Sequence, residues 1–406
     1  MTFETANARM VTLGQSHVLS DYLELDNQKQ QELLGQIEKI DWRVLRHFPP
    51  KTGGHTQGSY QPLGAVTVEE IAQKRDEYEK IGVTALRQQR VGAVLLAGGQ
   101  GTRLGQEVPK GTVDIGETRT LYIFECLFKT LLGVAQKAGA WVPLYIMTSV
   151  KNHDQTVEFL LEKGFFGYNP FFVQFFIQDM APAVDQNGHV LMEGPGSIFL
   201  SPNGNGGWYT SMQRSGMVKH ARDRGVTHLN VFAVDNVLQS IADPVFIGAT
   251  LAAGVDCGAK VVRKNTPDER IGVLCLENGR PAIVEYYEMT PDMQNCHTPD
   301  GRLAYAFGVI LNYLFDMEKL SDITAELPMH LVKKKVPHYR QGRMIIPETE
   351  NAWKFESLVV DMVAHMDRVL PFEVVREQEF APIKNQTGID SIESARALLR
   401  AQGVAL

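Results

Sequence analysis

A glycine-rich stretch with two basic side chains is the part of the sequence best suited to bind an anion. It reads Gly98-Gly99-Gln100-Gly101-Thr102-Arg103 and continues to Pro109-Lys110. Glycines let the backbone approach a phosphate closely and turn its N–H groups toward it. Arg103 offers a fork of donors for phosphate oxygens, and Lys110 offers a mobile point charge. The stretch therefore predicts a phosphate-binding loop.

Two commoner glycine-rich motifs do not fit this loop. A P-loop ends in Gly-Lys followed by Ser or Thr, whereas Lys110 is preceded by Pro109. A dinucleotide-binding fingerprint needs a third glycine at the position that Leu104 occupies. The remaining alternative is a tight turn without function, and the combination of three glycines with Thr-Arg and Pro-Lys argues against it.

A carboxylate follows another apolar segment. Asp235 comes directly after residues 229–234 and is followed by Asn236. Such a carboxylate can hold Mg²⁺, which prefers oxygen ligands and keeps substrate phosphates as partners. An Asp that caps a loop is the ordinary alternative, so this interpretation depends on the glycine-rich loop nearby.

Around these residues, apolar strands alternate with helices. Residues 91–97, directly before the loop, are apolar on both faces, as expected of a buried parallel strand. Further strands are expected at 142–148, 173–177 and 229–234, and helices at 121–138, 152–163, 208–225 and 244–253. This alternation predicts a doubly wound α/β core that binds ligands at the carboxyl ends of its strands. Asn278-Gly279, between segments 271–276 and 282–286, predicts a hairpin and hence a mixed sheet.

The N-terminal part reads differently, as a helical arm. Helices are expected within 16–48 and over 67–90, the latter with capping-box spacing between Thr67 and Glu70. Asn27 with Gln30 is interpreted as a similar cap, and residues 49–66 as a linker or loop. The predicted domains are a helical arm (1–85), a catalytic core (86–345) and a small C-terminal domain (346–406).

Composition excludes several classes of protein. The 406 residues carry 40 Lys and Arg against 47 Asp and Glu, a net charge of −7, which argues against nucleic-acid binding. No apolar run approaches the ~18 residues of a membrane span, and the N-terminus does not resemble a signal peptide. The four cysteines form no CxxC pair, as expected in a reducing cytosol. We expect a cytoplasmic enzyme with no membrane, nucleic-acid or obligatory protein partner.

The loop also carries a family resemblance. Its pattern Leu-x2-Gly-x-Gly-Thr-x-Leu-x4-Pro-Lys resembles that of sugar nucleotidyltransferases, and it is most similar to the UDP-N-acetylglucosamine pyrophosphorylase branch of the UDP-sugar pyrophosphorylase family. Segments that look like that family's motifs follow in its order at 145–149, 203–207, 234–237, 242–244, 256–262, 284–286 and 379–385. The shorter form, with Asn203 in place of an Asp, looks like the bacterial uridylyltransferases of this branch.

The resemblance implies a Rossmann-like, GT-A-like core and a uridylyltransferase reaction. UTP and a sugar 1-phosphate give UDP-sugar and pyrophosphate, by Mg²⁺-assisted in-line attack of the sugar phosphate on the α-phosphorus. Because no side-chain nucleophile is needed, the protein mainly positions two anions and neutralises their charge.

The resemblance also implies a role for individual residues. The residues implied to act on the phosphates are Arg103, Lys110 and Lys384. The residues implied to bind the nucleotide are Ala97, Gly98, Gly99, Gln178 (as the reader of uracil) and Gly204. The residues implied to contact the sugar are Asn205, Glu285, Val309, Leu358 and Val360, and the metal ligand is Asp235, with Mg²⁺ as cofactor. Strand alternation would place Glu285 on the opposite side of its strand from Val284 and Tyr286.

Three of the sugar positions depart from the family pattern. Val309 stands where the N-acetylglucosamine enzymes carry Asn, and Leu358 and Val360 replace an aromatic pair near the acetyl group. A hydrogen bond lost in a buried site costs about 1 to 3 kcal/mol if its partner stays unpaired. The sugar therefore stays open between N-acetylglucosamine or a related hexose on one side and glucose or a broad range on the other.

Two other classes of protein remain as alternatives. A non-catalytic nucleotide-sugar binding protein is suggested by the altered strand at Val309, but the presence of Arg103, Lys110 and Asp235 argues against it. An NAD-dependent oxidoreductase is disfavoured by Leu104.

Overall fold

The chain is seen in a computed structural model that describes residues 1–50, 58–323 and 327–406. It divides into two compact units, which we describe separately. The smaller unit comprises residues 1–56, 179–207 and 327–358, and the larger unit comprises 57–178, 208–326 and 359–406, each over its described part. The predicted domain boundaries after residues 85 and 345 stay a prediction. Residues 51–57 of the predicted linker lie outside the described residues.

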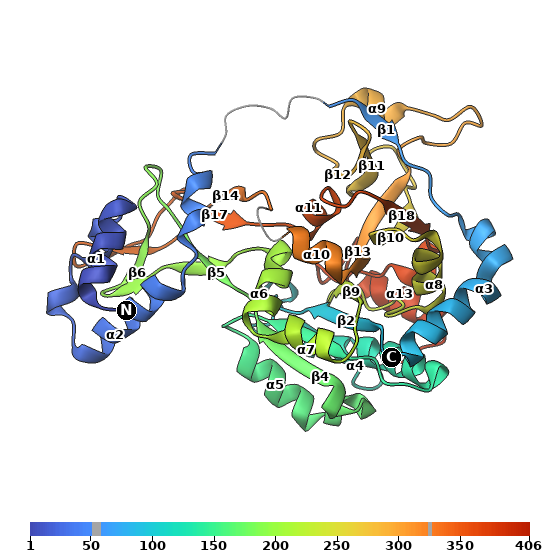
Figure 1. Ribbon diagram of the computed structural model, residues 1–406, viewed down its shortest axis with the longest axis horizontal. Helices are drawn as coiled ribbons and strands as arrows, with labels where there is room; N and C mark the ends of the chain where they lie inside the picture. Colours follow the sequence, from blue (N-terminus) through green and yellow to red (C-terminus); the bar gives the residue numbers. More distant parts are fainter. Residues whose placement is uncertain (51–57, 324–326) are drawn as a thin grey trace. The chain divides into compact units, whose positions relative to one another are not determined.

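The larger unit is built on a ten-stranded mixed sheet (Figure 1). Four neighbouring strands run parallel, in the order β4 (Val173–Ile177), β3 (Leu144–Thr148), β2 (Val91–Leu96) and β9 (His228–Ala233). β13 (Phe307–Asp316) lies antiparallel to β9. The predicted α/β class with a mixed sheet is confirmed, and the four strands lie within one or two residues of their predicted ranges.

The remaining strands extend the sheet beyond β13. β10 (Cys257–Arg263) pairs antiparallel with β13 and parallel with β18 (Val369–Glu373), while β1 (Tyr60–Pro62) pairs with β11 (Val273–Glu277). β11 and β12 (Arg280–Val284) form the predicted hairpin. Asn278 and Gly279 at its turn have φ values of 51° and 81°, as a type I′ turn requires.

Helices of the larger unit cover the sheet and connect its strands. They are α3 (Val68–Arg87), α4 (Ile123–Ala138), α5 (His153–Glu162), α6 (Trp208–Arg214), α7 (Met217–Asp223), α8 (Pro244–Ala253), α9 (Pro291–Asn295), α10 (Met317–Asp322), α11 (Val359–Val363), α12 (Arg376–Glu379) and α13 (Ile392–Ala401). The capping box of Thr67 and Glu70 is present. The helix predicted over 208–225 is in fact two helices, because Gly216 between α6 and α7 has a φ of 80°.

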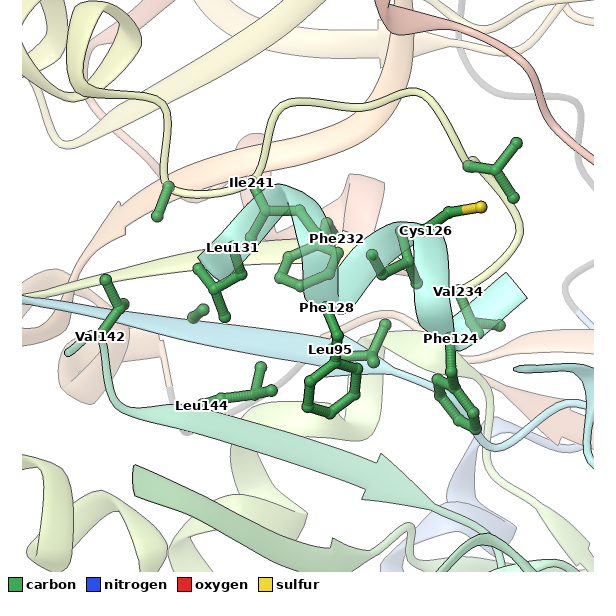
Figure 2. Close-up of a cluster of buried hydrophobic side chains, with 14 of the residues drawn as sticks. Leu95, Phe124, Cys126, Phe128, Leu131, Val142, Leu144, Phe232, Val234 and Ile241 are labelled. Carbon is green, nitrogen blue, oxygen red and sulfur yellow. The ribbon is translucent and has the colours of Figure 1, made fainter. Parts of the chain in front are cut away.

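The packing of α4 on the sheet shows why its apolar residues recur at helical spacing. Figure 2 shows Phe124, Phe128 and Leu131 of α4 beside Leu95 of β2 and Leu144 of β3. All five side chains are almost completely buried. Burial of each such side chain stabilises the fold by about 1.5 to 3 kcal/mol. The packed helix and strands therefore hold the ends of the parallel strands, and the segments that follow them, in fixed positions.

The smaller unit combines helices with short strands from three parts of the chain. Its elements are α1 (Phe3–Thr12), α2 (Asn27–Lys39), β5 (Met180–Pro182), β6 (Met192–Gly194), β7 (Ser197–Ile198), β8 (Leu200–Pro202), β14 (His330–Lys334), β15 (His338–Arg340), β16 (Arg343–Ile345) and β17 (Ala352–Glu356). The rest of the helical prediction over 16–48 appears as short 3₁₀ turns. The predicted cap of α2 was wrong by one residue: Asp26, with an extended backbone, accepts the N–H of Lys29.

In the part of the chain that the structure describes, no helix has the length and apolar character needed to span a membrane.

Candidate active site

The carboxyl ends of the four parallel strands bring several predicted site residues together in the larger unit. In the sheet register, Leu96 of β2 lies beside both Met147 of β3 and Ala233 of β9, and Thr148 of β3 lies beside Ile177 of β4. The segments that follow these strands therefore emerge at one edge. They carry the glycine-rich loop, Gln178 and Asp235, and such an edge is where open α/β sheets bind ligands.

The glycine-rich loop folds back on itself. The N–H of Gly101 donates to the carbonyl of Val108 at 2.8 Å, and the N–H of Lys110 donates to the carbonyl of Gly99 at 3.2 Å. Lys110 is thus returned to the start of the loop. Arg103 lies in a 3₁₀ turn, Thr102–Leu104, with its side chain exposed.

The predicted uracil reader lies directly against the loop. Gln178 is buried, and a Cβ atom added to Gly98 would lie only 2.7 Å from its Oε1 atom. A larger residue at position 98 would displace this amide. The backbone N–H of Gln178 donates to the Thr148 carbonyl at 2.8 Å. Ala97, which directly follows β2, is also buried.

Asn152 holds the start of the glycine-rich loop in place by hydrogen bonds. The sequence alone did not identify this residue. Its side chain is fully buried and donates to the carbonyls of Ala97 (2.9 Å) and Gly99 (3.3 Å), while its Oδ1 atom accepts the N–H of Ser149 at 2.7 Å. Asn152 precedes α5 but makes no side-chain cap bond to it. An Asn before a helix normally suggests a cap, and the only other signal was the family-like segment 145–149 just before it.

Lys110 and Asp235 form the charged centre of this edge. Their Nζ and Oδ2 atoms are 3.7 Å apart. Burial lowers the pKa of Lys110, Asp235 opposes this effect, and the positive charges of Lys384 and Arg103 lower the pKa further. We call Arg103, Lys110 and Lys384 the cation cluster. Three mutually repelling cations, with Asp235 near Lys110 and Asp390 near Lys384, suit the binding of a polyanion.

A backbone hydrogen bond of the neighbouring residue holds the segment of Lys384 beside Asp235. The N–H of Ile383 donates to the carbonyl of Asp235 at 2.9 Å, which fixes this late part of the chain beside β9. The Lys384 Nζ atom itself is 2.9 Å from Asp390 Oδ2, and its side chain is 47% exposed. Because both side chains are partly exposed, Lys384 can exchange Asp390 for another anion without leaving an unpaired charge buried.

Glu285 and Val309 meet at Gly272. A Cβ atom on Gly272 would lie 3.2 Å from Glu285 Oε1, and the Gly272 carbonyl accepts the N–H of Val309 at 2.9 Å. The expectation that Glu285 lies within its strand was wrong, because β12 ends at Val284. The Glu285 N–H is bound by Glu288 Oε2 at 3.0 Å, which turns the chain out of the sheet. Helix α11, which carries Val360, packs against β12.

The smaller unit holds the other predicted positions. Gly204 has a φ of 85°, and a Cβ atom there would lie 2.2 Å from the Ser357 carbonyl. The Ser357 N–H donates to the Asn203 carbonyl at 2.8 Å, so the segment with Gly204 and Asn205 wraps around the residue before Leu358. The structure thus brings Gly204, Asn205 and Leu358 together within this unit, and the remaining predicted residues lie in the larger one.

The fold and this edge define a class of enzyme. An α/β sheet that presents a glycine-rich loop, an amide and a cation cluster at the carboxyl ends of its strands is suited to a nucleoside phosphate, as in nucleotidyltransferases. Residues 26–404 match the family model described as UTP--glucose-1-phosphate uridylyltransferase, and the chain belongs to this family. It is a uridylyltransferase that acts on UTP and a sugar 1-phosphate.

Similar proteins span nearly the whole chain. The chain is 34% identical to human UDP-N-acetylhexosamine pyrophosphorylase-like protein 1, over 98% of this chain and 84% of that protein. It is 32% identical to the UDP-N-acetylglucosamine pyrophosphorylase of Saccharomyces cerevisiae, over 95% and 87%. The solved UDP-N-acetylglucosamine pyrophosphorylase of Trypanosoma brucei, in complex with an inhibitor, matches with a TM-score of 0.84 and 25% identity, over 98% and 84%.

The chemistry of Asp235 fits a divalent metal ion, which enzymes of this family generally use. Across residues 1–50, 58–323 and 327–406, no three or more His, Cys, Asp or Glu side chains gather as a metal site. Mg²⁺ commonly takes only one or two carboxylates and completes its shell with water and substrate phosphates. A single partly exposed carboxylate beside a phosphate-binding loop meets that description.

Proposed function

We propose that this enzyme makes a UDP-sugar from UTP and N-acetylglucosamine 1-phosphate or a related hexose 1-phosphate, with Mg²⁺ as its metal and the cytoplasm as its place of action. The observation that carries the site assignment is the meeting of Gly98, Gln178, Lys110 and Asp235 at one edge of the sheet. The names of the human and yeast relatives support the choice of sugar. Four free cysteines fit a reducing compartment.

The nucleotide end of the site selects UTP. The Gln178 side chain offers both a donor and an acceptor, which a pyrimidine edge can satisfy. Because Gly98 has no side chain, the ligand can approach the loop backbone beside this amide. Ala97 and Gly99, held by Asn152, complete this part of the site.

The phosphate end lowers the barrier to transfer. An oxygen of the sugar 1-phosphate attacks the α-phosphorus, a new P–O bond forms, and the bond to the bridging oxygen breaks so that pyrophosphate leaves. The cation cluster neutralises the charge on the phosphates and holds them in line. Asp235 would hold Mg²⁺, which supplies further neutralisation of the phosphate oxygens when it is bound.

The sugar end is more aliphatic than the resemblance alone would lead one to expect. We propose that Glu285 accepts hydrogen bonds from sugar hydroxyls and that Val309 and Val360, in the same larger unit, contact the sugar. The sugar-contacting roles of Asn205 and Leu358 stay predictions from the resemblance. The Val309 N–H donates to the Gly272 carbonyl at 2.9 Å, and Gly272 lies next to the Glu285 carboxylate. The aliphatic side chain of Val309 favours a second candidate, a UDP-glucose or broad-specificity pyrophosphorylase.

A panel of sugar 1-phosphates tests the proposal. Pyrophosphate release would be measured with UTP and Mg²⁺ for N-acetylglucosamine, N-acetylgalactosamine, glucose and galactose 1-phosphates, and repeated with ATP, CTP and GTP. The highest kcat/KM with an N-acetylhexosamine and UTP is the expected result. The highest value with glucose 1-phosphate would favour the second candidate. Binding of UTP by calorimetry without turnover on any sugar would instead indicate a nucleotide-sugar binding protein.

A further inference from the structure

A fully buried lysine lies at the centre of an ion network in the larger unit. Lys260 lies in β10, and its side chain has no exposed surface. Its Nζ atom is 3.1 and 3.0 Å from the two carboxylate oxygens of Glu379 and 3.3 Å from Asp243 Oδ2, and it donates to the Ser240 carbonyl at 3.1 Å. Burial acts to lower the pKa of Lys260, yet Glu379 and Asp243 hold it above its usual value, so the side chain stays charged.

Stability alone does not require this arrangement. Removing charges from water costs several kcal/mol per ion, and apolar side chains of similar volume often replace a buried ion pair without loss of stability. What charges add is a defined geometry, because each hydrogen bond fixes a distance and a direction.

Glu379 links two segments that are distant in sequence. Its Oε2 atom accepts the N–H of Ser240 at 2.8 Å. Its backbone carbonyl accepts the side chain of Asn236 at 2.7 Å, and Asn236 Oδ1 accepts the N–H of Ala381 at 2.9 Å. Both Asn236 and Glu379 are buried. The N–H of Val237 also donates to the Ala381 carbonyl at 3.4 Å, so four hydrogen bonds join residues 236–240 to 379–381. The Lys260 ammonium group binds both segments, at Ser240 and at Glu379.

The proposed phosphate-binding residues lie directly beside these bonds. Asp235 comes immediately before Asn236, and its carbonyl accepts the N–H of Ile383. Lys384 is the next residue. We propose that Lys260, with Glu379 and Asp243, is a positioning device that locks residues 379–384 against the loop after β9 and so sets where Lys384 and Asp235 meet the phosphates.

This inference rests on the proposed roles of Asp235 and Lys384. A displacement of 1 Å in a catalytic arrangement can cost about 100-fold in rate. Because Lys384 has only Asp390 as a side-chain partner in the described structure, the backbone of its segment must supply the precision.

The first experiment compares two glutamates. Glu379→Gln keeps the size of the side chain and removes its charge. The control is Glu373→Gln: the Glu373 side chain is 8% exposed against 11% for Glu379, and it binds Arg263 of the same strand β10 at 2.9 Å. We expect Glu379→Gln to lower kcat at least tenfold with KM for the sugar phosphate unchanged within twofold, and Glu373→Gln to leave kcat within twofold. Equal effects of the two variants on kcat would overturn the proposal.

Amide hydrogen exchange reports on positioning without using activity. In Glu379→Gln, the amides of Ala381 and Ile383 should exchange at least tenfold faster than in the wild type, while the amide of Leu95 in β2 keeps its rate. Unchanged protection at Ala381 and Ile383 would refute the inference. If Glu379→Gln does not fold, Lys260→Met combined with Glu379→Met leaves no unpaired lysine and should give the same acceleration.

Double variants separate this inference from the function on which it rests. Lys384→Ala and Glu379→Gln together should lower kcat by less than the product of their single effects. The reason is that Glu379→Gln acts in part by displacing the Lys384 side chain, which Lys384→Ala has already removed. Full multiplication of the two effects would contradict action through Lys384. If Lys384→Ala alone leaves kcat unchanged, the proposed role of Lys384 fails, and the exchange rates still decide whether the network fixes its segment.

Discussion

Replacing Lys110 by Met should make the enzyme more stable and much less active. Met keeps most of the aliphatic volume and removes the charge. In the free enzyme, burial and the nearby charges of Lys384 and Arg103 disfavour a charged Lys110 more than Asp235 favours it, as the lowered pKa of this lysine indicates. With a triphosphate bound, the balance reverses, because the same charge then faces several phosphate oxygens.

The expected loss of activity follows from the charge and its surroundings. The Lys110 Nζ atom is 3.7 Å from Asp235 Oδ2, so a phosphate at a similar distance would interact with it by about 4 kcal/mol at an effective dielectric constant near 20. Competition with water reduces a hydrogen bond to a charged group to about 1.5 to 3 kcal/mol net. We therefore expect Lys110→Met to lower kcat by about 10- to 150-fold.

The gain in stability should depend on pH. A lysine whose pKa is lower in the native than in the unfolded state binds fewer protons when folded, so the wild type gains free energy of unfolding as the pH rises through the interval between these two pKa values. Below that interval Lys110 is charged in both states, and its charge destabilises the native state by the full amount. Above the ordinary lysine pKa it is neutral in both states, and this destabilisation is absent. The advantage of Lys110→Met in melting temperature should therefore be present at pH 7 and shrink under alkaline conditions.

Thermal melts and pyrophosphate release check both parts. Lys137→Met is the control, because Lys137 forms an ion pair of 2.7 Å with Glu79 and lies in α4, outside the proposed site. It should leave kcat unchanged and should not raise the melting temperature. A melting temperature of Lys110→Met at or below that of the wild type, or a kcat within twofold of the wild-type value, would contradict the prediction.

Three further predictions concern the nucleotide, the sugar and the metal. Gly98→Ala should raise KM for UTP about 5- to 150-fold in steady-state assays, since its Cβ atom would displace Gln178 at a cost of about 1 to 3 kcal/mol. Gly133→Ala, with open space around its Cβ atom, should leave this KM unchanged. Val309→Asn should move the sugar preference toward N-acetylhexosamine 1-phosphates, and an identical sugar profile would exclude position 309 as a determinant. Chelation by EDTA should abolish turnover and added Mg²⁺ should restore it, and full activity in EDTA would contradict the metal role of Asp235.

The strands were predictable because their signal is local. Residues 91–97 are apolar on both faces, and the structure buries all of them in the middle of a sheet. The hairpin at Asn278-Gly279 was equally predictable, since few residues adopt positive φ at both turn positions. Errors occurred at boundaries, as with the cap at Asp26 and the end of β12 before Glu285.

Buried polar residues could not be predicted in the same way. Asn152 and Lys260 have sequence neighbours that suggest a helix cap and a strand, but their partners lie at Ala97 and Glu379, far along the chain. The same holds for the smaller unit, which three separate segments build. No local pattern specifies such partners, because they depend on how the whole chain folds.

The bond between the Ile383 amide and the Asp235 carbonyl has a consequence for folding. It joins residues that are 383 − 235 = 148 positions apart, whereas Asn152 and Ala97 are 55 apart. Contacts across long loops form at a higher entropic cost and therefore tend to form late. A partly folded chain can thus have β2, β3, β4 and the glycine-rich loop in place while β9 and the Lys384 segment are still undocked, because Leu96 of β2 and its partner Ala233 of β9 are also 233 − 96 = 137 positions apart. Such an intermediate would show native secondary structure before it gains catalytic competence.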